Sequence, residues 1–82
     1  MRVTLLYFAG VRDLVGRARE DLTLPPDVRS VGALAAWLER ERPALAGRLA
    51  TVRIARNEEF ARVEDAIAEG DELALIPPVA GG

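Results

Sequence analysis

The chain has 82 residues, half of them apolar, and a formal net charge of −2 from 11 basic and 13 acidic side chains. This length predicts one domain with a single modest core. The sequence contains no cysteine and no histidine, which excludes disulfides, zinc-binding cysteine motifs and a histidine general base, and leaves little chemistry for an autonomous active site.

Charges of both signs are spread along the chain without a basic block, so nucleic-acid binding is not expected. No apolar run approaches the about 18 residues of a membrane span. The N-terminus lacks a signal-peptide pattern, and the expected location is the cytoplasm. No metal or other cofactor is expected either, since histidine and cysteine ligands are missing.

Residues 2–9 are rich in β-branched, aromatic and aliphatic side chains and predict a first strand. Residues 10–16 predict a turn or short helix ended by Gly16. Residues 18–24 predict a second strand in a hairpin with the first, which the PPD sequence at 25–27 ends. Both faces of the first strand are largely apolar, with Val3, Leu5 and Tyr7 on one face and Thr4, Leu6 and Phe8 on the other.

Ser30 is a suitable N-cap for a helix over 31–42, which Pro43 closes. Trp37 is predicted to lie beside the apolar stripe of this helix and to seal it against a sheet. The stripe itself recurs at helical spacing and comprises Val31, Leu34, Ala35 and Leu38.

Residues 51–56 predict a third strand, 57–59 a turn and 60–63 a short fourth strand. Residues 64–71 predict a helical turn ended by Gly70, and 72–76 the last strand. One amphipathic helix and these strands predict a two-layer α+β sandwich, with a domain over 1–76 and a tail over 77–82. If the last strand lies beside the first, the uncovered sheet face forms an apolar patch of the kind that marks a protein partner; it carries Leu6, Phe8, Ala74 and Ile76.

The sequence LIPPVAGG at 75–82 carries no charged or hydrogen-bonding side chain. Pro77 and Pro78 hold it extended, and from 77 to 82 it can reach roughly 20 Å at about 3.3 Å per residue. Gly81 and Gly82 lack a Cβ and fit a narrow tunnel. The terminal carboxylate is a poor acyl donor until a partner enzyme activates it, most simply as an acyl-adenylate. The tail therefore predicts an acyl group carried to another protein's active site, with an inert flexible end as the alternative.

Three stretches, LYFAGVRDLVG, RIARNEEF and EGDELALIPPVAGG, together resemble the ubiquitin-like sulfur carriers of the MoaD/ThiS family, which includes the small subunit of molybdopterin synthase. The resemblance covers nearly the whole chain. It implies a β-grasp fold, with a mixed sheet of four to five strands and one main helix on one face.

The resemblance also implies the chemistry of the tail. An E1-like enzyme would use ATP to adenylate Gly82, and a sulfur donor protein would then supply a thiocarboxylate. The tail would insert into the large subunit of molybdopterin synthase and pass its sulfur to cyclic pyranopterin monophosphate, which makes this chain a sulfur-donating subunit without an active site of its own. The inserted residues would be Pro77, Pro78, Val79, Ala80, Gly81 and Gly82.

Phe8, Phe60 and Ile76 match apolar positions that the family uses against its partners. For Phe8, ordinary core packing is the alternative. The recurrent charged positions Arg12 and Asp71 are explained equally well by turn-stabilising or solvated roles. Arg56 replaces a small or apolar residue that is more frequent in the family, and is predicted to affect a sheet edge.

Two other functions stay open. The chain could be a sulfur carrier for another pathway, such as thiamine thiazole, tRNA thiolation or cysteine synthesis, although its length and PPV sequence argue mildly against thiazole carriers. It could also be a ubiquitin-like modifier joined to lysines of target proteins. Because the basic residues are all arginine, such a modifier could not form side-chain-linked chains with itself.

Overall fold

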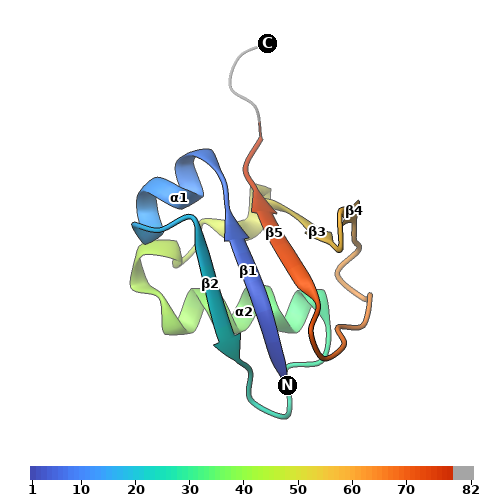
Figure 1. The fold of residues 1–82 in the computed structure, drawn as a ribbon. Coiled ribbons are helices and arrows are strands. Elements are labelled where there is room, and N and C mark those ends of the chain that lie inside the picture. Colours follow the sequence, from blue (N-terminus) through green and yellow to red (C-terminus); the bar gives the residue numbers. More distant parts are fainter. Residues whose placement is uncertain (79–82) are drawn as a thin grey trace.

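The computed structural model describes residues 1–78, in which five strands form one mixed sheet of order β2-β1-β5-β3-β4 (Figure 1). The strands are β1 (Arg2–Tyr7), β2 (Arg19–Thr23), β3 (Arg53–Arg56), β4 (Glu59–Phe60) and β5 (Glu72–Ile76). The helices are α1 (Ala9–Val15) and α2 (Val31–Glu41), followed by the 3₁₀ turns η1 (Pro43–Leu45) and η2 (Leu49–Thr51). β1 and β5 are parallel, whereas the other neighbouring strands are antiparallel.

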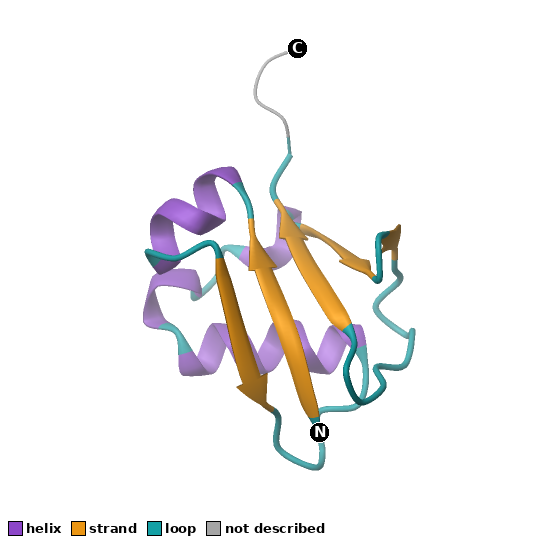
Figure 2. Cartoon of the chain, in the orientation of Figure 1, coloured by secondary structure: helices purple, strands orange, loops and turns teal. Residues whose placement is uncertain are grey.

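The helices leave one sheet face uncovered. α2 crosses the other face, and α1 packs beyond the end of β1 (Figure 2). Strand alternation sends every second side chain of the central strands into the core beneath them. These buried strand residues are Val3, Leu5, Tyr7, Ile54, Leu73 and Leu75. The α+β sandwich, the pairing of the first two strands and the position of the last strand beside the first are confirmed.

α2 begins and ends close to the predicted residues. The Ser30 hydroxyl accepts a hydrogen bond from the Ala33 amide at 3.1 Å, which satisfies one of the free N–H groups of the first turn. Trp37 packs against the edge of the core, as predicted. The shorter helix, α1, ends at Gly16, whose φ is 86°, a left-handed conformation that glycine adopts without strain.

The predicted helical turn over 64–71 is wrong, because this segment contains no helix. This segment and the residue before it instead bond to the start of α2: the Val31 amide donates to the Asp65 carbonyl, and the Gly32 amide to the Val63 carbonyl, both at 2.9 Å. A Cβ on Gly32 would lie 3.1 Å from the Val63 oxygen, so the loop and helix approach closely. The sequence pattern predicted backbone hydrogen bonds within this segment, but in the structure its backbone bonds to α2, which is distant in the sequence.

Three strand boundaries also differ from the prediction. The first strand ends at Tyr7, because α1 begins at Ala9. The third strand starts at Arg53, since the preceding residues form η2. The fourth strand is the short β4 and does not extend to residue 63.

Candidate functional site: the uncovered sheet face

The uncovered face of the sheet forms a shallow apolar groove of about 440 Å³. The side chains of the central strands that alternate with the core residues supply its floor. Its lining residues are Leu6, Phe8, Ala55, Glu58, Phe60, Glu72, Ala74 and Ile76. This set includes the four residues that strand alternation assigned to the uncovered face.

The three predicted interface residues all line this groove. Phe8 is 45% exposed and Phe60 is 56% exposed, while Ile76 is half-buried. Phe8 follows β1 in an extended conformation, and its amide donates to the Leu75 carbonyl at 3.3 Å. Its side chain therefore continues the alternation of the strand onto the uncovered face, and the core-packing alternative for Phe8 is wrong. The role of the three residues as a partner interface stays a prediction.

Phe60 reaches the groove through the tight hairpin that joins β3 to β4. Asn57 and Glu58 form the turn with φ at 50° and 71°, the left-handed values that a two-residue hairpin turn needs. The pairing that follows places Phe60 opposite Ala55, on the uncovered face. Strand alternation alone could not assign Phe60, because its face depends on the geometry of this turn.

Arg53 was not singled out by the sequence; it does not line the groove itself, but its side chain contacts Phe60, which does. The centre of its guanidinium group lies 3.8 Å from the centroid of the Phe60 ring. A stacked cation of this kind contributes about 0.5–1 kcal/mol at an exposed site. The alternation of β3, in which Ile54 is buried, was the signal that could have placed Arg53 on the uncovered face.

Asp71 anchors the hairpin to the start of β5. Its side chain is buried and accepts hydrogen bonds from Arg56 Nε, from Asn57 Nδ2 at 3.0 Å and from the Ala68 amide at 2.7 Å. Burial alone raises the pKa of Asp71, but the bonds from Arg56, Ala68 and Asn57 outweigh it and hold the pKa below its usual value. Arg56, expected to affect a sheet edge, therefore pairs with a buried carboxylate, and Asp71 has the turn-stabilising role considered for it.

Arg12 lies outside this arrangement. It belongs to the last turn of α1 and is exposed. Its backbone carbonyl accepts the hydrogen bond from the Gly16 amide at 2.8 Å that caps the helix. It is not among the residues that line the groove.

The tail leaves the domain beside the groove. β5 ends at Ile76, Pro77 is half-buried and Pro78 is exposed beyond the end of the sheet (Figure 1). Pro77 and Pro78, predicted to belong to the inserted tail, thus directly follow a strand that lines the groove. Their insertion into a partner stays a prediction. The predictions for Val79, Ala80, Gly81 and Gly82 lie outside the described residues.

Glu20 forms a second polar cluster, at the core side of β2. Tyr7 Oη donates to Glu20 Oε1 at 2.7 Å, Arg17 Nη1 lies 3.3 Å from Glu20 Oε2, and Arg42 pairs with the same carboxylate. Burial, and then the bond to Glu20, raise the pKa of the Tyr7 phenol well above its ordinary value. Because Arg42 caps α2, this cluster ties the helix to the sheet, and its function is structural.

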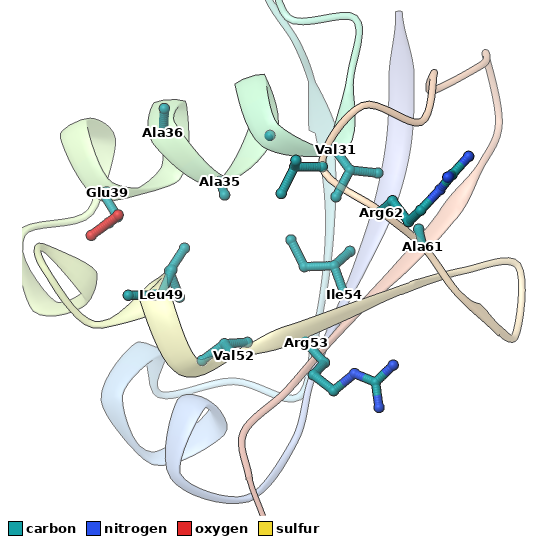
Figure 3. Close-up of a pocket in the computed structure, with 13 residues that line it drawn as sticks. Val31, Ala35, Ala36, Glu39, Leu49, Val52, Arg53, Ile54, Ala61 and Arg62 are labelled. Atoms are coloured by element: carbon teal, nitrogen blue, oxygen red, sulfur yellow. The ribbon is translucent and has the colours of Figure 1, made fainter.

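A second groove, of about 500 Å³, lies on the helix side between α2 and the segment over 49–63 (Figure 3). Figure 3 shows Ile54 pointing from β3 toward α2, while the Arg53 side chain extends on the other side of the strand. Three charged residues, Glu39, Arg53 and Arg62, line this groove. Among the described residues it contains none of the predicted interface residues and neither Pro77 nor Pro78, so its larger volume does not make it the functional site.

Among the described residues there is neither a candidate metal site nor a helix suited to span a membrane. Over 1–78, no group of three or more histidine, cysteine, aspartate or glutamate side chains is placed to hold a metal ion. Within the same part of the chain, neither helix is long and apolar enough to cross a membrane.

A mixed sheet with a parallel central pair, helices on one face and a C-terminal segment leaving the last strand defines a ubiquitin-like β-grasp protein. The ThiS family matches residues 5–82, and the chain belongs to this family. The match runs from the first strand through the tail, so the family assignment includes the residues on which the predicted chemistry depends.

Individual relatives agree with this assignment. The molybdopterin synthase sulfur carrier subunit of Aedes aegypti is 38% identical over 90 residues, which cover 100% of this chain and 90% of that protein. The corresponding subunit of Chlamydomonas reinhardtii is 34% identical over 84 residues, with 100% of both chains covered. A crystal structure of small archaeal modifier protein 1 from H. volcanii has a TM-score of 0.80 and 30% identity, and covers 95% of this chain and 98% of that chain.

Proposed function

We propose that this chain is the sulfur-carrier subunit of a molybdopterin synthase. The observation that carries the proposal is the apolar groove lined by Phe8, Phe60 and Ile76, beside the strand from which the tail leaves. The relatives named as molybdopterin synthase sulfur carrier subunits, which match over the full chain, support it. In this proposal the 1–76 domain binds the partner, and the 77–82 tail delivers the reacting group.

The chemistry takes place at Gly82. An E1-like enzyme converts its carboxylate to an acyl-adenylate with ATP and releases pyrophosphate. Sulfide-level sulfur from a sulfur donor protein then displaces AMP and gives the thiocarboxylate. The tail then enters the large subunit, in which the sulfur passes to cyclic pyranopterin monophosphate and water hydrolyses the acyl group back to the carboxylate. The domain itself needs no general base for these steps, because the partner enzymes supply the catalytic groups.

Deletion of Gly82 tests whether the domain binds the partner independently of the reacting group on the tail. The truncated chain should unfold at the same temperature as the full chain and bind the large subunit with similar affinity, because the deletion keeps every residue that lines the groove over 6–76. The truncated chain should not transfer sulfur, because it lacks the residue whose carboxylate is activated, and no molybdopterin should form. Molybdopterin formation by the truncated chain would contradict the proposal.

A ubiquitin-like modifier is the second candidate function, which the likeness to small archaeal modifier protein 1 supports. In that case an amine, rather than a sulfur donor, would attack the activated Gly82 carboxyl. A modifier predicts target peptides from cells that carry a lysine joined to Gly82, detectable by mass spectrometry. If such peptides are absent while the thiocarboxylate is present, the sulfur-carrier function is favoured.

A further inference from the structure

Arg53 lies beside the end of the groove from which the tail leaves, without being one of the residues that line it. It pairs across the sheet with Ile76, the last residue of β5. Figure 3 shows its side chain on the side of β3 that faces away from α2, and the guanidinium stacks on Phe60. A permanent positive charge is thus held next to an apolar surface and close to the start of the tail.

No ion pair among residues 1–78 involves Arg53. Stacking on an aromatic ring occupies the flat side of a guanidinium group but leaves its N–H donors at the edge free to bond. A planar fork of this kind matches a carboxylate, which can accept two parallel hydrogen bonds from it. Arg53 therefore presents an oriented donor that fits an acidic side chain of another protein.

The acidic side chains of the groove lie at its opposite end. Glu72 begins β5, four positions before Ile76, which corresponds to about 13 Å at about 3.3 Å per residue. Glu58 is its neighbour, because the Asn57 amide donates to the Glu72 carbonyl at 2.8 Å. The groove thus has a positive end at the tail and a negative end away from it, so that a partner of matching charge can dock in one direction only.

We propose that Arg53 is a specificity-determining residue of this surface: held over Phe60 in the free carrier, it pairs with a carboxylate on the partner protein beside the opening that receives the tail. The inference rests on the proposed function, since the partner is the large subunit into which the tail inserts. The partner surface should combine an apolar projection that fills the groove, a carboxylate opposite Arg53 and a basic side chain opposite Glu58 and Glu72.

The test is the affinity of the full chain for the isolated large subunit, measured by calorimetry at low and high salt. Arg53→Met keeps a flexible apolar side chain over Phe60 but removes the charge, and should weaken binding about tenfold. Arg53→Glu should weaken it further. Arg48→Glu is the matched control, because Arg48 is exposed at the start of η2 and does not line the groove; its effect should stay within about twofold, as expected for a solvent-exposed charge that is screened by salt.

Salt and a charge exchange test whether the pairing is direct. High salt should weaken binding of the unchanged chain more than that of Arg53→Met, because the variant has no ion pair to screen. Replacing acidic residues around the tail opening of the large subunit with lysine, one at a time, should identify one change that restores binding of Arg53→Glu.

Three results would overturn the inference. They are unchanged affinity and salt dependence in Arg53→Met, an equal loss in Arg48→Glu and Arg53→Glu, and no rescue by any lysine replacement at the opening. In all three cases the unchanged chain would still bind the large subunit and transfer sulfur. Failure of the proposed function looks different, because the unchanged chain would then neither bind the large subunit nor transfer sulfur to the precursor.

Discussion

Leu75 and Ile76 are neighbours on β5, but Leu75 is fully buried in the core, whereas Ile76 lines the groove on the opposite face. Both faces of the central strands are apolar, and α2 covers one of them. Apolar side chains on the covered face therefore hold the fold together, while those on the uncovered face add little to its stability. If a partner protein buries the apolar side chains of the uncovered face, that burial stabilises the complex instead.

Paired substitutions at these two neighbours should give the largest difference. Leu75→Ala should lower the free energy of unfolding by about 2–5 kcal/mol, because it leaves a cavity in a fully buried site. Ile76→Ala should lower it by less than about 1.5 kcal/mol, since its side chain is only partly removed from water. Denaturant unfolding measures both values. Equal losses would mean that the uncovered face is part of the folding core.

Asp71→Asn should have the next largest effect on stability. Loss of the charged partner of Arg56 at a buried site should cost about 1–3 kcal/mol at neutral pH. Asp71 has a lower pKa in the folded chain than its usual value, so its contribution is complete above the unfolded pKa and is lost as the pH falls through the folded pKa.

The unfolding free energy of the unchanged chain should therefore fall more steeply below about pH 4 than that of Asp71→Asn. Asp13→Asn is the matched control, because Asp13 is exposed on α1. Parallel pH profiles for the unchanged chain and Asp71→Asn would contradict the assigned role of Asp71.

Phe60→Ala separates the two faces by function. It should weaken binding to the large subunit by about 1–2 kcal/mol, as expected for an aromatic anchor in an interface. The variant should remain folded, because Phe60 is more exposed than buried. Calorimetric binding and thermal unfolding, compared with Leu14→Ala on exposed α1 surface, measure the two effects. Loss of stability without loss of binding would reverse the assignment of this face.

Glu58→Gly should give the smallest effect, and in the opposite direction. Glu58 holds φ at 71°, a conformation that costs a residue with a Cβ about 1–2 kcal/mol. Glycine removes this strain but increases the entropy of the unfolded chain, so the net stabilisation should be up to about 1 kcal/mol. A destabilised variant in denaturant unfolding would show that the Glu58 side chain has an unrecognised structural contact.

Local sequence was sufficient for the features that depend on neighbouring residues. Alternation in the first and last strands assigned Leu6, Phe8, Ala74 and Ile76 to one face, and the structure places all of them in the groove. The cap at Ser30 and the proline at Pro43 bracketed α2. In each case the signal and the structural element occupy the same short stretch of chain.

The features that sequence could not supply depend on distant contacts. The segment over 64–71 is not helical because its backbone bonds elsewhere: the Asp65 carbonyl accepts from the Val31 amide of α2, and the Ile67 amide donates to the Arg29 carbonyl. The stacking of Arg53 on Phe60 requires both the face of β3 and the turn at Asn57 and Glu58. Phe60 was predicted as an interface residue only through the family resemblance. The hairpin turn that sets its face contains no glycine, the residue that usually marks such a turn in a sequence.

The most direct test of the central claim starts with the chain carrying a thiocarboxylate at Gly82. It is mixed with the large subunit and cyclic pyranopterin monophosphate, and both molybdopterin and the mass of the carrier are followed. The account predicts molybdopterin formation together with return of the carrier to its carboxylate form. An intact thiocarboxylate and no product, with a large subunit shown to be active with another carrier, would contradict it and assign the chain to a different sulfur pathway.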